Sequence, residues 1–255
     1  MIEVQHLSKR FELTRQQRKE LSTTEKFAVA VEDVSFTCHP GRIFSLLGPN
    51  GAGKTTILRM IATIYKPTSG SIYVNGINVE EQPNEARKTI GFLTGSTGMY
   101  GRLTPNELIK YFADLYGMEN SAFEARKKYL FDLLQIHDFA NKRISKLSTG
   151  MKQRVSICRT MIHNPDVVIF DEPTSGLDVI SADSIIQLIR DCKAQGKTVI
   201  FSSHIMSEVE LLCDDLAIIA KGKLIFNDTF ESFRAQMTTT NITEEFIAKV
   251  QNATV

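Results

Sequence analysis

The sequence predicts an α/β fold, in which a mostly parallel sheet is flanked by helices, with antiparallel strands near the N-terminus and an inserted helical subdomain. Three patterns support this fold class. A glycine-rich loop joins a strand pattern at residues 42–47 to a helix pattern at residues 56–61. A second apolar run, at residues 167–170, is short and uncharged, as expected of a parallel strand buried on both faces. Between the two runs, residues 95–156 are predicted to be mainly helical.

The N-terminal region is predicted to form antiparallel strands. Residues 2–11 and 27–37 have strand patterns, and a further short strand is expected between glycines at residues 70–76. The charged residues 12–26 separate the first two strands. Because hairpin loops usually have only about 2 to 5 residues, this segment is interpreted as an insertion.

Two helices are predicted in the middle of the chain. Thr104-Pro105-Asn106-Glu107 is a capping box with proline at the first helical position, and apolar residues follow at helical spacing until Gly117. A second helix is predicted at residues 123–134, with leucines along one side. These helices are expected to form a subdomain inserted into the α/β core.

The chain is predicted to consist of one main domain and a short extension. The main domain covers residues 1–227 and includes the helical subdomain at about residues 95–156. Beyond this point the apolar pattern thins, and residues 228–255 are expected to form one or two peripheral helices.

The glycine-rich loop has the residue types of a phosphate-binding loop. Its glycines allow successive backbone N–H groups to turn inward around phosphate oxygens at a helix N-terminus. Lys54 is expected to reach the β- and γ-phosphates of a nucleotide, and the Thr55 hydroxyl to bind Mg²⁺. The flanking strand and helix argue against a glycine-rich turn that matches by accident. The predicted phosphate-binding residues are Gly48, Pro49, Asn50, Gly51, Ala52, Gly53, Lys54, Thr55 and Thr56.

Two carboxylates follow the apolar run at residues 167–170, where the carboxyl end of a parallel strand places ligand-binding groups. Asp171 is expected to hold the Mg²⁺ shell, and Glu172 to orient and deprotonate the attacking water. Alternatively, the pair would cap the next helix. The complete phosphate-binding loop favours the catalytic interpretation.

Three further motifs complete a recognisable order along the chain: Leu147-Ser148-Thr149-Gly150-Met151, Ser175-Gly176-Leu177-Asp178 and His204. With the phosphate-binding loop and the carboxylates, this order resembles the ATP-binding subunits of ABC transporters over about residues 1–226. The Leu-Ser-Thr-Gly-Met variant is similar to that of the NatA-type subunits of exporters.

The resemblance implies a head-to-tail dimer, of two identical or two related chains. ATP and Mg²⁺ would lie between the phosphate-binding loop of one chain and the signature motif of the other. Ser148, Thr149 and Gly150 would thus complete the partner's site, with a helix N-terminus facing the γ-phosphate, and Asp178 would lie at the nucleotide. By itself, Leu-Ser-x-Gly also describes a serine N-cap before any amphipathic helix.

His204 follows a second buried-strand pattern at residues 198–203. Alone, it would be interpreted as a hydrogen-bonded loop residue, but the resemblance implies that it contacts the γ-phosphate. The other four histidines have no spacing suited to a metal.

The chain departs from the family pattern in two places. The family usually has a glutamine after the strand at residues 90–93, whereas this chain has Thr94-Gly95-Ser96-Thr97-Gly98. A hydroxyl of Thr94, Ser96 or Thr97, or a water, would replace it. Phe11 matches the aromatic position that stacks on adenine, although the insertion leaves Phe27 as an alternative, and either ring could instead be a core residue.

Composition limits the remaining function classes. A formal net charge of +1 offers no basic field for nucleic acid, and 42% hydrophobic residues indicate an ordinary soluble protein. Four cysteines without a CxxC pair indicate reduced thiols of a cytosolic protein. No apolar run approaches the roughly 20 residues that span a bilayer. Any membrane role must therefore come through a partner. The resemblance implies that this partner is a separate permease, with this chain on the cytoplasmic face of the membrane.

The predicted function is that of an ATPase subunit that drives export through this permease. Na⁺ is the preferred cargo, and drugs, lipids or polysaccharides are the alternatives. A soluble regulatory ATPase acting on ribosomes or DNA is a different interpretation. Ribosome-acting relatives carry two phosphate-binding loops and DNA-repair relatives carry long coiled-coil insertions, whereas this chain has one loop and a compact helical insert. A module that binds ATP without hydrolysing it is disfavoured because Glu172 and His204 are both present.

Overall fold

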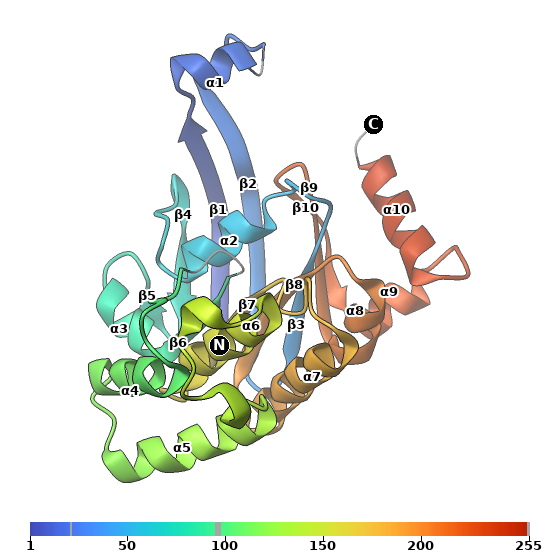
Figure 1. The fold of residues 1–255 in the computed structure, drawn as a ribbon. Coiled ribbons are helices and arrows are strands. Elements are labelled where there is room, and N and C mark those ends of the chain that lie inside the picture. Colours follow the sequence, from blue (N-terminus) through green and yellow to red (C-terminus); the bar gives the residue numbers. More distant parts are fainter. Residues whose placement is uncertain (21, 95–97, 254–255) are drawn as a thin grey trace.

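The computed structural model describes residues 1–20, 22–94 and 98–253 and contains two sheets (Figure 1). The first is antiparallel, in the order β2-β1-β4-β5. The second, in the order β10-β9-β3-β8-β7-β6, is parallel except for β10. The mixed α/β architecture matches the predicted fold class. The strands of the first sheet are β1 (Ile2–Glu12), β2 (Phe27–Cys38), β4 (Ser69–Val74) and β5 (Ile77–Asn78). Those of the second are β3 (Ile43–Leu47), β6 (Ile90–Leu93), β7 (Val167–Asp171), β8 (Thr198–Ser203), β9 (Asp215–Ala220) and β10 (Lys223–Thr229).

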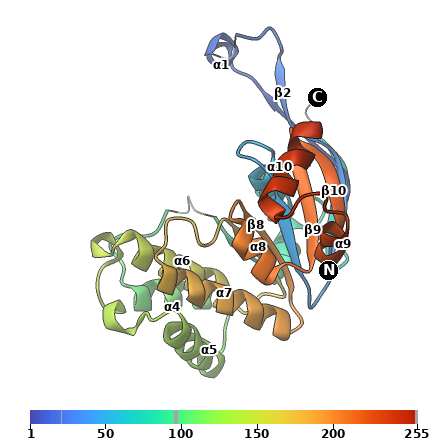
Figure 2. The same ribbon diagram turned by 90° about the vertical axis from the view of Figure 1, so that its right-hand side faces the viewer.

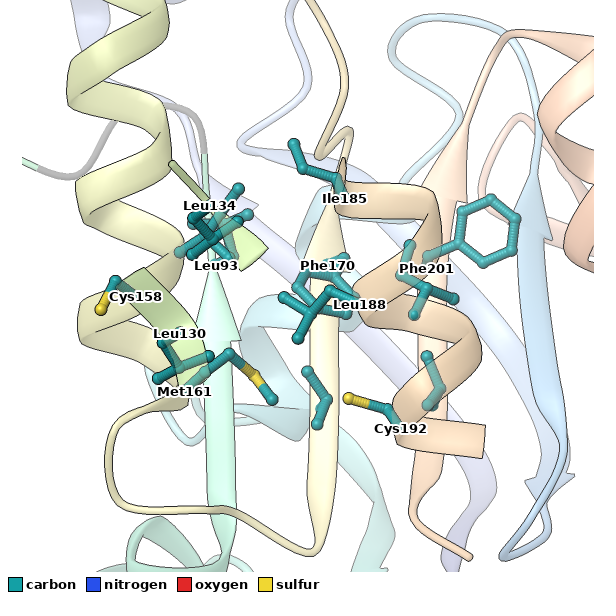
Figure 3. Packing of buried hydrophobic residues seen from close by; sticks show 14 of the residues in the cluster. Leu93, Leu130, Leu134, Cys158, Met161, Phe170, Ile185, Leu188, Cys192 and Phe201 are labelled. Carbon is teal, nitrogen blue, oxygen red and sulfur yellow. The ribbon is translucent and has the colours of Figure 1, made fainter. Parts of the chain in front are cut away.

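Helices cover both faces of the parallel sheet, and each face has its own hydrophobic core. Successive residues of β7 point to opposite faces. Phe170, labelled in Figure 3, joins the core beneath α4 to α7 together with Val168, whereas Val167 and Ile169 join the core around α2 and the antiparallel sheet. Burial on both faces explains why β7 lacks polar alternation. The helices are α1 (Arg15–Glu20), α2 (Lys54–Ile61), α3 (Pro83–Thr89), α4 (Pro105–Leu115), α5 (Asn120–Leu133), α6 (Thr149–Met161), α7 (Val179–Ala194), α8 (Met206–Leu212), α9 (Phe230–Ala235) and α10 (Ile242–Asn252).

The predicted capping box at the start of α4 is present. Thr104 Oγ1 accepts a hydrogen bond from the Glu107 backbone N–H, and the Glu107 side chain accepts one from the Thr104 N–H. The reciprocal bonds satisfy two backbone donors that a helix start otherwise leaves unpaired, which is why this boundary is readable from four residues.

The predicted insertion continues the first hairpin away from the body. β1 and β2 extend beyond the sheet and carry α1 at their tip, as Figures 1 and 2 show. No side chain of α1 is buried, so this helix adds nothing to either core.

The C-terminal segment contributes to the fold. Phe230 and Phe233 of α9 belong to the core beneath α4 to α7, and Phe233 is fully buried. Strand β10 continues to Thr229, so the predicted boundary at residue 227 falls inside a strand. The division of the chain into a main domain and an extension stays a prediction.

Candidate nucleotide site

The phosphate-binding loop connects β3 to α2 and has two positions that only glycine can occupy. Gly53, the N-cap of α2, has a φ of 108°, and a Cβ there would lie 2.5 Å from the Ala30 carbonyl oxygen. A Cβ on Gly48 would lie 2.3 Å from the Ile219 carbonyl oxygen. Both distances are too short for a real contact, so the neighbouring strands β2 and β9 require glycine at these two positions.

Lys54 begins α2 and its ammonium group is held against the loop. Nζ donates hydrogen bonds to the carbonyl oxygens of Gly48, at 2.6 Å, and Pro49, at 3.1 Å. Burial lowers the pKa of Lys54, and the nearby carboxylates of Glu172 and Asp171 oppose this shift. The positive charge therefore lies inside the loop, where the phosphates of a nucleotide would meet it.

Thr55, Asp171 and Ser202 form a connected cluster where the first turn of α2 meets the ends of β7 and β8. The Thr55 hydroxyl donates to Asp171 Oδ1 at 3.1 Å, and the Ser202 hydroxyl donates to the same oxygen at 2.7 Å. Because β7 and β8 are parallel and register Asp171 opposite Ser202, the contact follows directly from the strand order.

The cluster fits Mg²⁺. Mg²⁺ prefers oxygen ligands and usually takes one or two carboxylates, keeping waters and substrate phosphate oxygens in the rest of its shell. The Thr55 hydroxyl supplies such an oxygen from the first turn of α2, and the Asp171 carboxylate supplies others from the end of β7. They are the residues that would hold the ion.

Glu172 leaves β7 in a left-handed backbone conformation, with a φ of 50°. This conformation costs a non-glycine residue roughly 1–2 kcal/mol. The Glu172 N–H donates to Ser202 Oγ at 3.1 Å and to the Ser202 carbonyl oxygen at 3.2 Å, which holds the turn. Glu172 Oε1 lies 3.4 Å from His204 Nδ1. The predicted base and the predicted sensor are thus neighbours.

Ser202 is a site residue that the sequence analysis did not identify. It is fully buried, contacts both carboxylate residues and follows the apolar middle of β8. The signal was present, since two adjacent serines end the run at residues 198–203. Their partners became visible only when β8 was placed beside β7.

A cavity of about 430 Å³ opens beside the cluster and reaches the start of α6. It is lined by Thr55, Thr94, Thr149, Asp171 and Glu172, among others. Of the three hydroxyls that would replace the missing glutamine, Thr94 therefore faces this cavity, while Ser96 and Thr97 lie outside the described residues.

Ser148 is the N-cap of α6, because its Oγ accepts a hydrogen bond from the Met151 N–H at 3.2 Å. Thr149 and Gly150 form the first turn, so their backbone N–H groups belong to the positive end of the helix. Asp178 caps α7 through the Ser181 N–H, and this bond lowers its pKa. The contacts of these residues with a nucleotide bound to a partner chain stay a prediction.

Phe11 lies on the projecting part of β1. Its ring meets the edge of Tyr65 at a centroid distance of 5.5 Å, and Lys9 Nζ lies 5.1 Å from its centre. The alternative aromatic residue, Phe27, is 52% exposed. The adenine stack on Phe11 stays a prediction.

Comparisons with known proteins agree with this site. A family model described as ABC transporter matches residues 31–175. The ABC transporter ATP-binding protein NatA of Bacillus subtilis is 41% identical over 227 residues, which cover 89% of this chain and 92% of the relative. The Nod factor export ATP-binding protein I of Rhizobium etli is 37% identical over 81% of this chain and 65% of its own length.

Solved structures have the same fold. The structure of an ATP-binding subunit of an ABC transporter matches with a TM-score of 0.85 and 26% identity, covering 98% of this chain and 99% of its own. A dimeric bacterial ABC transporter cassette matches with a TM-score of 0.78 and 25% identity, over 90% of this chain and 98% of its own. Within the described part of the chain, no helix has the length and apolar character to cross a bilayer. With a phosphate-binding loop, a buried aspartate and an adjacent glutamate in this common fold, the chain belongs to the ABC transporter family, as one of its ATP-binding and ATP-hydrolysing subunits.

Proposed function

We propose that this subunit forms an ATP-dependent head-to-tail dimer and drives a separate membrane permease that exports its cargo. The observation that carries the proposal is the arrangement of Thr55, Asp171, Glu172 and His204 around the start of α2 and the ends of β7 and β8. It combines a cation-binding pair, a carboxylate base and a histidine within one cluster. An ATPase that does work on a partner needs such a site to respond to the γ-phosphate.

Hydrolysis follows from the roles of these side chains. Lys54 and the loop N–H groups bind the phosphate oxygens and stabilise their charge. Mg²⁺, held by Thr55 and Asp171, would neutralise further phosphate charge when bound. Glu172 accepts a proton from the attacking water, whose oxygen bonds to the γ-phosphorus as the bond to the β-phosphate oxygen breaks. His204 contacts the γ-phosphate and registers its loss.

The second half of each site comes from the partner. Ser148, Thr149 and Gly150 at the positive end of α6 face the γ-phosphate bound by the other chain, and Asp178 lies close to it. Support comes from the caps of α6 and α7, which hold these residues at helix starts, and from the relative solved as a dimer. The partner is a second copy or a related chain.

The permease is a separate membrane protein, and this subunit lies on the cytoplasmic face of the membrane. Na⁺ is the proposed cargo, because the Leu-Ser-Thr-Gly-Met signature is of the NatA type and the relative named NatA is 41% identical. Drugs, lipids or polysaccharides are the alternative cargoes. ATP-driven uptake of Na⁺ into inverted vesicles holding the permease and this subunit would test the choice, and ATPase stimulation without Na⁺ uptake would exclude it.

The catalytic proposal is tested by Glu172→Gln. The amide keeps the shape of the side chain but loses its proton affinity, so turnover should fall by about 10²-fold or more while ATP binding persists. The variant should accumulate as an ATP-bound dimer on size exclusion. Glu85→Gln, at an exposed glutamate paired with Lys88, is the matched control and should behave as wild type. Near-normal turnover of Glu172→Gln would remove it from the role of base.

A further inference from the structure

One buried carboxylate outside the described cluster joins two segments of the site. Glu208 lies on α8 and is only 8% exposed. Its Oε1 accepts a hydrogen bond from the Thr174 hydroxyl at 2.5 Å, and its Oε2 accepts one from the Ser203 hydroxyl at 2.7 Å. Ser203 Oγ in turn accepts from the Ile205 N–H at 3.0 Å. All three members of the bridge are buried.

The bridge joins two residues that are close along the chain to the predicted base and sensor. Thr174 comes two residues after Glu172 and lies between it and Asp178, whereas Ser203 immediately precedes His204. The two hydroxyls are 34 and 5 residues away from Glu208 along the chain. A single carboxylate therefore ties the segment that follows β7 to the segment that follows β8.

Glu172 and His204 do not hold each other in place. Their 3.4 Å separation is longer than a good hydrogen bond, and their side chains are 33% and 53% exposed. Neither burial nor a strong mutual bond sets their positions. The positions of the two side chains are therefore set by the backbone segments that carry them. These segments are joined by the hydrogen bond to Ser202 and by the Glu208 bridge.

The chemistry of the bridge suits a positioning role. A buried carboxylate is costly unless hydrogen bonds satisfy its oxygens, and here each oxygen accepts one hydroxyl bond. Charge-assisted bonds of this kind are roughly twice as strong as neutral ones. Displacing either segment would leave a buried charge poorly satisfied, so the two segments are held to one relative position.

We propose that Glu208 is a positioning residue for ATP hydrolysis, which holds the Glu172 and His204 segments in register and links the Asp178 segment to the histidine. The inference rests on the proposed roles of Glu172 and His204. Because Glu208 contacts neither of these side chains, it acts on turnover through their backbones and leaves the phosphate-binding loop unaffected.

The test compares Glu208→Ala with Glu208→Gln and with Glu210→Ala. The matched control, Glu210, lies on the same helix but is 45% exposed and pairs with Arg234. Glu208→Ala should lower kcat by about 10-fold or more, because displaced catalytic groups lose rate steeply, while ATP affinity stays unchanged. Glu208→Gln should restore most of kcat, because its amide can accept one hydroxyl bond and donate to the other hydroxyl. Glu210→Ala should match wild type.

Two variants that each remove one hydrogen bond of the bridge keep the test valid if Glu208→Ala fails to fold. Thr174→Val and Ser203→Ala each remove one bond, and each should lower kcat without changing ATP affinity. Neither should lower kcat further in the Glu208→Ala background, because the bridge is already lost. Wild-type kcat in both folded single variants would overturn the inference, as would a loss in Glu208→Ala that Glu208→Gln fails to restore.

If Glu172→Gln turns over normally, the proposed function fails first. If Glu172→Gln is inactive and Glu208→Ala is not, only this inference fails.

Discussion

His163 should make the fold sensitive to acid. It follows α6, and its ring stacks on Tyr116 at the end of α4, with centroids 3.8 Å apart and planes within 2°. Its Nε2–H donates to the Ile90 carbonyl oxygen at the start of β6, at 3.2 Å. Among the described residues, its buried Nδ1 has no hydrogen-bond partner. The neutral ring thus joins the helical subdomain to the catalytic sheet.

Protonation of this ring is disfavoured in the folded protein. Burial lowers the pKa of His163 to about 4, and the nearby positive charges of Lys197 and Arg126 act in the same direction, while the Ile90 bond opposes them. In the unfolded chain the pKa of histidine is about 6.5. As the pH falls below that value, the unfolded state binds a proton that the folded state does not, so stability is lost between about pH 6.5 and pH 4.

The size of the loss follows from these two pKa values. Relative to pH 8, the free energy of unfolding should fall by about 2 kcal/mol at pH 5 through this residue alone, and by about 3 kcal/mol below pH 4. Other groups titrate in the same range, so a variant must isolate the contribution. His163→Phe keeps a ring against Tyr116 and cannot titrate.

The assay is urea unfolding at pH 8 and pH 5, followed by far-UV circular dichroism. The fall in unfolding free energy between the two pH values should be smaller in His163→Phe than in wild type by about 2 kcal/mol. His163→Phe also loses the hydrogen bond to Ile90, but this loss lowers the unfolding free energy at both pH values. It therefore cancels when the fall between pH 8 and pH 5 is compared for the two proteins. His39→Gln, at an exposed histidine, should keep the wild-type profile. Equal falls in wild type and His163→Phe would refute the reasoning.

Two further predictions concern the nucleotide site. Ser148→Arg should bind ATP but not hydrolyse it, and mixing it with Lys54→Ala chains should restore partial ATPase activity, because one composite site of each heterodimer is wholly wild type. Heterodimers without activity would contradict the head-to-tail arrangement. Ser202→Ala should lower both turnover and melting temperature, since it removes a hydrogen bond to the Asp171 carboxylate worth about 1.5–3 kcal/mol. Ser207→Ala, at an exposed serine on α8, is its control, and unchanged melting and turnover in Ser202→Ala would contradict the prediction.

The parts of the protein that depend on local chemistry could be predicted from the sequence. Gly53 and Lys54 identify a phosphate-binding loop because backbone freedom and a positive charge are properties of single residues. The capping box at Thr104 is complete within four residues. The uniformly apolar run before Asp171 indicates a strand buried on both faces, and this inference does not depend on which strands lie beside it. Fold class and family follow from such signals, and so do the main candidate catalytic residues, whose roles stay a prediction.

Contacts between distant segments required the tertiary structure. Ser202 meets Asp171 because β8 lies beside β7, and Glu208 meets Thr174 because α8 packs against β8, the neighbour of β7. No periodicity along the chain encodes these pairs, since strand order and register are decided by burying both faces of the whole sheet at once. The same reason explains Phe233, which looked peripheral in the sequence and became a core residue only when α9 packed against β9 and β10. Local patterns thus specified the chemistry of this ATPase, while the packing of the sheet decided which groups hold it in place.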